Sequence, residues 1–561
     1  MKFIFVYGGV MSGVGKGVVT SSIAKILSNY GYDVTCVKID PYINFDAGTM
    51  NPIEHGEVFV TYDGGETDQD IGNYERFLNK DISKRNNITT GQIYKKIIDD
   101  ERSGKYLGKT VEFIPHVPNE IINRIMESSK GHDVSVVEIG GTIGDFENIP
   151  FLFSSKRIEL MHGKENVIHI LVTYLPIPKT LGEMKTKPTQ HAIMQLNSYG
   201  IVPDFIITRS ERDVDDRRKE KIAKYSNILS DHIISCPNVD TIYYVPLKLI
   251  EQGFDKKLIS DMKLPMRESN WSKWKKLVDN IRNSKKYIDV AVVGKYIGTG
   301  SFVLYDSYIS VKEALIHAGA NLGVGVRIHW LDSKKDGHDL SKYDGIIVPG
   351  GFGSSGVEGK INAIKFAREN DVPYLGLCYG MQLAVVEYAR NVLGWDAHTT
   401  EIEKTSHPVI DILPEQKELM EEGKYGGTMR LGEYVAVIKE GTLVHSLYKN
   451  SGRIENDSKK IENYKKTAPF RVGITKPGDI LILEKHRHRY EVNPKFVDDF
   501  EKSGLSISGV HRRHDGINLV EFIEIPKNKF FIGTQAHPEL KSRLEDPSPL
   551  FVGFVKVCAG L

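Results

Sequence analysis

One cysteine stands between glycines at the point where an apolar segment changes into a helical one. The sequence Gly-Leu-Cys-Tyr-Gly occupies residues 376–380, after the apolar run 372–377 and before the helical pattern 381–390. A tight strand-to-helix turn holds a side chain clear of the backbone, and small neighbours permit that turn. The N-terminus of the following helix favours a thiolate. The pattern therefore predicts that Cys378 is a nucleophile.

A distant His-Pro-Glu sequence supplies partners for this cysteine. His537 is the predicted base, and Glu539 is the predicted carboxylate that orients the imidazole ring. A thiolate activated in this way attacks a carboxamide, releases ammonia and leaves a thioester for water to hydrolyse.

A glycine-rich segment is expected to hold the oxyanion of that reaction. Pro-Gly-Gly-Phe-Gly at residues 349–353 follows the apolar run 345–348. Glycines let backbone N–H groups approach a substrate closely, so the amides of Gly351 and Tyr379 are the candidate donors. Each of these motifs alone is common in proteins without such activity. Their order within one βα pattern favours the catalytic interpretation.

The N-terminus carries a second chemical signal. Residues 8–17, Gly-Gly-Val-Met-Ser-Gly-Val-Gly-Lys-Gly, lie between a strand pattern and a helical pattern at 18–28. Backbone N–H groups, a helix N-terminus and Lys16 would converge there on a phosphate. The Walker A pattern is not met, because the spacing from Gly9 to Gly15 is one residue too long and Gly17 replaces the hydroxyl residue. Magnesium would therefore need carboxylates from elsewhere, and Asp70 and Glu138 are the candidates.

The pattern of apolar runs predicts an α/β fold. Residues 2–7, 34–39, 134–139, 167–172 and 205–208 form β-type runs separated by helix-length segments, as in a parallel sheet covered on both faces. A second series follows at 289–293, 326–330, 345–348 and 373–377, with a helix near 305–318. Two doubly wound three-layer domains are expected, at 1–266 and 288–561, with a linker at 267–287. The polar residues 451–479 are expected to form a surface loop or insertion.

The bulk composition limits the class of protein. The chain has 561 residues, a net charge of +1 and four widely spaced cysteines. Near-neutral charge argues against a dedicated nucleic-acid binder, and the cysteine spacing argues against a disulfide framework or a zinc cluster. We find neither a signal peptide nor an 18-residue apolar run, so a cytoplasmic location without membrane contact is expected.

Residues 288–561 resemble the class I glutamine amidotransferases. The resemblance rests on the cysteine turn, the Pro-Gly-Gly-Phe-Gly segment and the His-Pro-Glu sequence. It implies that further residues bind the glutamine substrate, namely Phe352, Gln382, Glu401 and Arg489. An arginine suits the α-carboxylate and a carboxylate suits the α-ammonium group.

The whole chain is similar to the CTP synthase family. The similarity is carried by residues 8–17, Lys-Ile-Asp-Pro-Tyr-Ile-Asn at 38–44, Gly-Thr-Met at 48–50, His-Gly-Glu-Val at 55–58, Tyr-Glu-Arg-Phe at 74–77, Val-Glu-Ile-Gly-Gly-Thr at 137–142 and Lys-Thr-Lys-Pro-Thr-Gln at 185–190. It implies that ATP phosphorylates the 4-oxygen of UTP and that ammonia then displaces phosphate. Lys16 and Lys38 would neutralise the transferring group, and Mg²⁺ would bind at Asp70 and Glu138.

This resemblance also assigns the nucleotide sites. The implied ATP-binding residues are Gly13, Val14, Gly15, Lys16, Gly17, Val18, Lys38 and Asp70, with Asp40 in the same site. The implied UTP- and CTP-binding residues are Ser12, Asp145, Phe146, Glu147, Lys185, Thr186, Lys187, Pro188, Thr189, Gln190 and Lys221.

The resemblance further implies regulation and assembly. Ammonia would pass through an internal tunnel near His55 and Val58, and GTP would activate glutamine hydrolysis through residues 426–432. CTP would inhibit. A homotetramer is implied, and many family members also form filaments.

Two other interpretations stay open at this stage. One is a cobyrinic-acid diamide-type amidotransferase, which activates a carboxylate; the sequence at 185–190 argues against it. The other is an inactive scaffold that senses nucleotides or polymerises, against which the complete set of candidate catalytic residues argues. Residues 451–479 also depart from the family pattern, because that connection is longer than expected.

Overall fold

The computed structural model describes residues 1–51, 55–180, 182–295, 298–299, 302–303, 305–335, 337–412 and 429–561. The chain forms two compact units, and each is described by itself. Unit 1 comprises Met1–Thr49 and Thr67–Val278, and unit 2 comprises Met50–Glu66 and Asp279–Leu561. The short segment Met50–Glu66 thus packs with unit 2, where Glu57 Oε2 accepts a hydrogen bond from the backbone N–H of Ser310 at 3.1 Å. The sequence instead predicts that this segment belongs to the N-terminal domain at 1–266.

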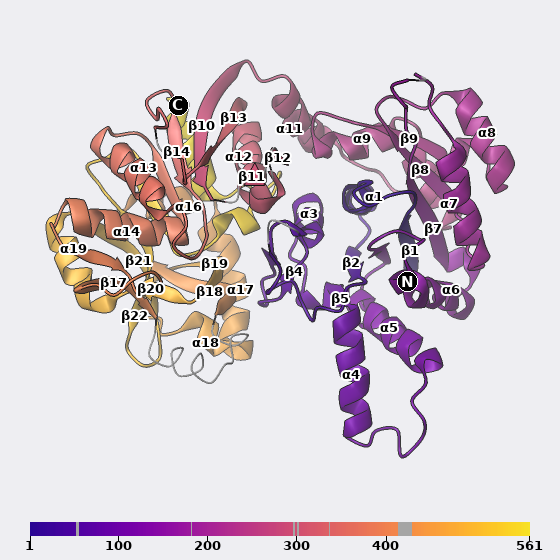
Figure 1. The fold of residues 1–561 in the computed structure, drawn as a ribbon, viewed down its shortest axis with the longest axis horizontal. Helices are drawn as coiled ribbons and strands as arrows, with labels where there is room; N and C mark the ends of the chain where they lie inside the picture. The colour runs from indigo at the N-terminus through magenta and orange to yellow at the C-terminus, as the bar shows by residue number, and fades with distance from the viewer. Residues whose placement is uncertain are drawn as a thin grey trace. The chain divides into compact units, whose positions relative to one another are not determined.

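Unit 1 is built on a seven-stranded sheet in which all strands are parallel (Figure 1). In order across the sheet, the strands are β5 (Asn87–Thr89), β2 (Val34–Asp40), β6 (Val134–Ile139), β1 (Lys2–Gly8), β7 (Val167–Tyr174), β8 (Phe205–Ser210) and β9 (Ile233–Pro237). Strands β2 and β6 are buried at every position, which explains their continuous apolar runs. All five strands expected from the sequence are present.

Helices flank this sheet (Figure 1). They are α1 (Lys16–Asn29), α3 (Gln69–Leu78), α4 (Thr90–Arg102), α5 (Phe113–Ser129), α6 (Ile149–His162), α7 (Lys187–Ser198), α8 (Asp216–Ser226), α9 (Val245–Ile250) and α10 (Phe254–Asp261). Helix α11 (Ser272–Arg282) spans the boundary between the two units and lies in the stretch 267–287 expected to link the two domains.

Unit 2 contains a nine-stranded mixed sheet. The first five strands are parallel: β13 (Val324–Asp332), β10 (Lys286–Gly294), β14 (Gly345–Val348), β15 (Tyr374–Leu377) and β23 (Phe531–Thr534). Four antiparallel strands extend it: β22 (Asn518–Glu524), β21 (Ser506–Arg512), β18 (Arg430–Ile438) and β19 (Ile480–His488). A smaller sheet joins β16 (Ala397–Thr399), β17 (His407–Ile412) and β20 (Tyr490–Val492). The predicted α/β class is confirmed in both units.

The large sheet of unit 2 separates two apolar cores. Along β14, Ile346 and Val348 contribute to one core and Ile347 to the other, as expected for side chains that alternate between the faces of a strand. The helices of this unit are α12 (Ile309–Leu322), α13 (Val357–Glu369), α14 (Tyr379–Asn391), α16 (Leu443–Asn450), α17 (Arg453–Thr467), α18 (Pro469–Val472), α19 (Val497–Ser503) and α20 (Pro549–Cys558).

The prediction of a loop at residues 451–479 is wrong, because much of that segment forms the helix α17. Its buried face is formed by Arg453, Asp457, Ile461 and Tyr464, which are spaced by three or four residues. Two of these four residues are charged, so an apolar stripe is hard to recognise in the sequence. The Asp457 carboxylate has a partner in the body of the unit, since it accepts a 2.9 Å hydrogen bond from the backbone N–H of Leu483.

Candidate functional site

The predicted nucleophile lies on a strained turn. Cys378 joins β15 to α14 and has φ 50° and ψ −101°, a conformation that non-glycine residues rarely adopt. Two residues later, position 380 requires glycine, because a Cβ there would lie 2.1 Å from the carbonyl oxygen of Val348. The turn therefore presents the cysteine at the end of the sheet, at the N-terminus of a helix.

The sheet brings the predicted base to the same edge. Strands β15 and β23 are parallel neighbours, and Leu377 is paired with Thr534. Cys378 follows the first of these residues directly, and His537 lies three residues beyond the second. Their shared sheet edge explains how two residues far apart in sequence become neighbours.

The three predicted triad residues form one connected group. His537 Nδ1 lies 2.7 Å from Glu539 Oε1, and the Cys378 side chain also interacts with the His537 ring. Burial alone would lower the pKa of His537, but the charges of Glu539 and Cys378 outweigh burial and hold that pKa well above its usual value. The ring is thus suited to carry a proton beside the nucleophile.

The glycine-rich loop after β14 packs directly against this group. A Cβ on Gly350 would lie 2.8 Å from His537 Cε1, so glycine permits the close approach of the imidazole. The Tyr379 hydroxyl donates a 3.1 Å hydrogen bond to the carbonyl oxygen of Gly353. Gly351 lies beside the Tyr379 ring, while the Phe352 side chain is 54% exposed. Both predicted oxyanion donors therefore belong to the wall around Cys378.

The residues expected to bind glutamine lie around the same centre. Gln382 Nε2 donates to the carbonyl oxygen of Tyr490 at 2.8 Å. Glu401 Oε1 accepts from the backbone N–H of Gly353 at 2.7 Å, so this carboxylate also holds the glycine-rich loop. Burial raises the pKa of Glu401, whereas the positive charge of Arg489 acts in the opposite direction. Glu401 is thus held by the loop and lies within the electrostatic influence of Lys295 and Arg489.

Two residues at this centre were not found by sequence reasoning. Gln535 Nε2 lies 3.6 Å from Cys378 Sγ, and Gln535 Oε1 accepts a 3.2 Å hydrogen bond from Gln382 Nε2. The sequence signal that could have identified Gln535 is its position two residues before the predicted base His537. Lys360, on α13, is fully buried near Cys378, and no sequence motif marks it.

In unit 1, the loop between β1 and α1 has the geometry expected for phosphate binding. Gly13 and Gly15 have φ 71° and 88°, and Gly15 is the N-terminal cap of α1. Lys16 Nζ donates to the carbonyl oxygen of Gly141 at 2.6 Å. A Cβ on Gly17 would lie only 1.8 Å from Asp70 Oδ1. The absence of the Walker A hydroxyl therefore has a steric reason: Asp70 occupies the space of that side chain.

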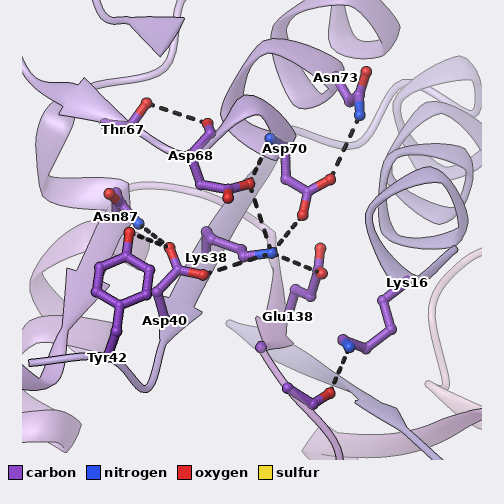
Figure 2. Close-up of polar contacts among 12 residues, drawn as sticks. Lys16, Lys38, Asp40, Tyr42, Thr67, Asp68, Asp70, Asn73, Asn87 and Glu138 are labelled. Carbon is purple, nitrogen blue, oxygen red and sulfur yellow. Dashed lines mark hydrogen bonds and ion pairs between the residues drawn. The ribbon is translucent and has the colours of Figure 1, made fainter. Parts of the chain in front are cut away.

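Strand register assembles a charged cluster beside this loop. Lys38 on β2 is paired with Glu138 on β6, and the two side chains lie 3.1 Å apart. Figure 2 shows Lys38 Nζ also facing Asp40, at 3.7 Å, and Asp68, at 3.9 Å. It forms its closest ion pair with Asp70. Four carboxylates therefore surround one ammonium group.

Helix α3 fixes two of the groups in this cluster. Asp68 caps the helix by accepting from the backbone N–H of Asp70 at 2.9 Å. Tyr74 lies one turn after Asp70, and its hydroxyl donates to Glu138 Oε2 at 2.5 Å. Asp40 accepts from Asn87 Nδ2 at 2.8 Å. The carboxylates are thus positioned by two strands and one helix.

The pKa directions show that the charged groups of the cluster act strongly on one another. Burial raises the pKa of Glu138, and the neighbouring Asp70 charge adds to this rise. Burial opposes the charged form of Lys38, yet Asp70 and Glu138 hold the pKa of that ammonium well above its usual value. Lys38 is therefore held in its protonated form by the carboxylates around it.

The residues expected to bind UTP and CTP belong to loops that follow three adjacent strands. Ser12 follows β1, Asp145–Glu147 follow β6 and residues 185–190 follow β7, so their backbones share one sheet edge. Asp145 accepts from the Thr142 hydroxyl at 2.9 Å, and Phe146 is 83% exposed.

The second half of this group surrounds the start of α7. Thr186, Thr189 and Gln190 are buried there, and Gln190 Nε2 donates to Thr186 Oγ1 at 3.2 Å. Lys185 donates to Glu183 Oε2 at 2.7 Å, and Lys187 and Pro188 form the first turn of the helix. Lys185, and to a lesser extent Lys221 on α8, lower the pKa of Glu183. Lys185 and Lys221 thus both act on one acidic residue.

A pocket of about 160 Å³ opens beside the phosphate loop. Its lining includes Gly15 and Val18 from the loop and α1. Arg209 and Asn238, from the ends of β8 and β9, complete it and are hydrogen-bonded to each other at 3.1 Å. Sequence reasoning did not find these two residues, because neither belongs to a recognised motif.

Comparisons with known proteins cover both units. Residues 2–264 match a family described as "CTP synthase N-terminus", and residues 303–557 match "Glutamine amidotransferase class-I". Within the described part of the chain, no helix is long and apolar enough to span a membrane.

Curated relatives match over the whole chain. The CTP synthase of Methanocaldococcus jannaschii is 48% identical over 573 residues, which cover 100% of this chain and 99% of that protein. That of Methanopyrus kandleri is 48% identical, with 100% and 99% covered. That of Sulfurisphaera tokodaii is 47% identical, with 100% of both chains covered. The chain therefore belongs to the CTP synthase family of glutamine-hydrolysing ligases.

Proposed function

We propose that this chain converts UTP to CTP in two coupled steps at separate centres. Unit 2 hydrolyses glutamine and releases ammonia. Unit 1 uses ATP to phosphorylate the 4-oxygen of UTP, and ammonia then displaces phosphate. The observation that carries this proposal is the presence in one chain of a Cys378–His537–Glu539 group and a lysine–carboxylate cluster beside a phosphate-type loop.

In unit 2, His537 takes the thiol proton of Cys378, and the resulting Sγ thiolate forms a bond to the carboxamide carbon of glutamine. The tetrahedral adduct then collapses, and ammonia leaves with the proton from His537. Water adds to the thioester, the C–S bond breaks and glutamate is released. Glu539 supports this cycle because it accepts the hydrogen bond from His537 Nδ1.

The walls of the same centre are assigned to substrate binding. The backbone amides of Gly351 and Tyr379 are proposed to donate to the oxyanion. Gln382, Glu401 and Arg489 are proposed to hold the glutamine backbone, with Phe352 at the open side, where it is 54% exposed. The opposite charges of Glu401 and Arg489 suit the two charged groups of an amino acid.

In unit 1, the loop of residues 13–18 is proposed to bind the phosphates of ATP, with Lys16 and Lys38 balancing the charge of the transferring group. Asp70 and Glu138 are proposed to hold Mg²⁺. The carboxylate oxygens of these two residues, and the several carboxylates around Lys38, fit a hard divalent cation. Bound there, Mg²⁺ would polarise and neutralise phosphate oxygens.

Mg²⁺ is commonly held by one or two carboxylates together with substrate phosphates, which suits the pair Asp70 and Glu138. Glycine at position 17 supports the same assignment, since it lets Asp70 reach the start of α1.

The lysines around α7 are proposed to bind the triphosphate of UTP. Lys185, Lys187 and Lys221 supply positive charge, and the loops with Ser12 and Asp145–Glu147 lie at the same sheet edge. CTP, which carries the same triphosphate, would compete there and inhibit. Both proposals rest on the family resemblance together with this arrangement.

A homotetramer is proposed for the assembled enzyme. Several apolar side chains are exposed around α6, which follows the segment Asp145–Glu147. They include Phe153 at 41%, Leu160 at 74% and Met161 at 59% exposure. Grouped exposed apolar side chains often mark protein–protein interfaces. Light scattering with and without nucleotide would test the tetramer.

Activation by GTP and internal transfer of ammonia are also proposed from the family resemblance. Residues 426–428 of the segment expected to respond to GTP lie outside the described residues. In the described remainder, Arg430 forms buried ion pairs with Glu491 and Glu521. His55 and Val58 stay the residues expected near the ammonia passage.

The direct test is the absorbance change that accompanies conversion of UTP to CTP. Purified protein would be assayed with ATP, Mg²⁺ and either glutamine or ammonium chloride. Product with both donors is expected. Product with neither donor, from folded protein, would contradict the proposed function.

A further inference from the structure

The buried side chain of Lys360 has no role in the mechanism derived above. It lies on α13, the helix that follows the glycine-rich loop, and its exposed fraction is 0%. Its Nζ atom lies 3.4 Å from the position of a Cβ on Gly351 and 5.1 Å from the centroid of the Tyr379 ring. The ammonium group thus sits behind both residues whose backbone amides are the proposed oxyanion donors.

This ammonium group has no hydrogen-bond partner among the described residues. Burying an unpaired charge is costly, so a lysine at such a position needs a reason. Of the charges that shift its pKa, that of Lys295 lowers the pKa and that of Cys378 raises it. No carboxylate among the described residues contributes to this shift, so Cys378 at the reaction centre is its electrostatic counterpart.

The groups that face Lys360 come from all the elements packed against it. Lys295 follows β10, Cys378 and Tyr379 begin α14, and His537 reaches the loop through Gly350. Burial, with a further contribution from Lys295, lowers the pKa of Lys360 to about 7, while Cys378 acts in the opposite direction. Its charge state therefore changes within the physiological range.

We propose that Lys360 is a positioning residue for glutamine hydrolysis. Its ammonium supplies buried positive charge behind the oxyanion loop when negative charge develops at Cys378 and on the substrate carbonyl oxygen. The proposal rests on the glutaminase role of Cys378 proposed above. Lys360 forms no covalent bond and transfers no proton. It acts through Gly351 and Tyr379 as a buried counter-charge while it is protonated.

The test compares Lys360→Met with Lys365→Met, a control on the same helix whose side chain is half-buried. Methionine keeps the volume and removes the charge. The expected result is a fall of about 30-fold in kcat/KM for glutamine in Lys360→Met, and less than two-fold in the control. Ammonia-dependent CTP synthesis should be unchanged in both variants. Thermal unfolding of both variants would check that each is folded.

The pH profile separates an electrostatic role from simple packing. For the unmodified protein, kcat/KM for glutamine should decline as pH rises above about 7, where Lys360 loses its proton. The decline should vanish in Lys360→Met and move to higher pH in Lys360→Arg, because guanidinium stays protonated. An unchanged kcat/KM in Lys360→Met, or the same alkaline decline in all three proteins, would overturn the proposal.

A parallel Cys378→Ala variant distinguishes failure of this inference from failure of the proposed function. If Cys378→Ala keeps glutamine-dependent activity, the glutaminase assignment itself is wrong. If it loses that activity while Lys360→Met behaves like the control, only the role of Lys360 is wrong.

Discussion

The glutaminase centre of unit 2 and the charged cluster of unit 1 are built in opposite ways. The first is held by backbone: Cys378 has φ 50°, and glycines at 350 and 380 allow close packing around it. Its acid and base groups already pair with each other, at 2.7 Å between His537 and Glu539. The second is held by strand register, and four carboxylates share the single ammonium of Lys38.

The difference suggests how each centre depends on ligands. A nucleophile and its base can be complete before substrate arrives, since their charges balance within the protein. A phosphoryl-transfer centre must accept highly charged nucleotides and a divalent ion, so an unbalanced charge in the free protein is useful there. We therefore expect substitutions in unit 1 to affect both nitrogen donors and substitutions in unit 2 to affect glutamine alone.

Lys16→Met should give the largest effect on the synthetase side. Its ammonium donates to Gly141 and is proposed to contact ATP phosphates, so CTP formation should fall by about 10³-fold with glutamine and with ammonium alike. Steady-state assays with both donors check this. The exposed Lys95→Met should behave as the unmodified protein. A loss confined to glutamine would break the comparison.

Glu539→Gln should lower glutamine hydrolysis by about 10²-fold, because the amide no longer holds the protonated His537 ring. Synthesis from ammonium should be retained. Glutamate release and CTP formation measured side by side test this. Equal losses with the two donors would show that the centres are not independent.

Gly17→Ala sharpens the comparison sterically. The new Cβ would lie 1.8 Å from Asp70 Oδ1, so Asp70 must move away from the start of α1. We expect about a ten-fold loss of ATP-dependent synthesis with both donors and a weaker response to Mg²⁺. Ser22→Ala, on the same helix, is the control. Unchanged Mg²⁺ dependence would argue against Asp70 as a ligand.

The smallest effect concerns stability and pH. His537 has a raised pKa in the folded state, so its stabilising contribution is complete below its unfolded pKa, near 6.5, and is lost as pH rises through the folded pKa. Glu539→Gln removes the main cause of the raised value. The variant should lose about 1 to 2 kcal/mol at pH 5.5 and less at pH 9.5. Denaturant unfolding at both pH values measures the difference, with the exposed Glu501→Gln as control.

Much of this architecture follows from patterns in the sequence. The continuous apolar runs predicted the strands of unit 1 because both faces of that sheet are buried. The triad candidates were also found from sequence, because their chemistry requires particular residues at a turn. Glycines and Lys16 between a strand and a helix predicted a phosphate loop, and the structure explains why Gly17 departs from the Walker A pattern.

Other features had no local signal. The pairing of Lys38 with Glu138 depends on the register of two strands far apart in sequence. Lys360 is polar yet fully buried, so it resembles a surface residue in the sequence. Helix α17 was predicted as a loop because half of its buried face is charged, and only tertiary partners such as Leu483 make those charges acceptable.

The account depends most on the claim that two separable centres operate in one chain. The most direct measurement compares CTP formation by Cys378→Ala from glutamine and from ammonium chloride, with Cys558→Ala as the matched control. We predict that Cys378→Ala loses synthesis from glutamine and keeps synthesis from ammonium, while the control keeps both. Retained synthesis from glutamine in folded Cys378→Ala would contradict the account.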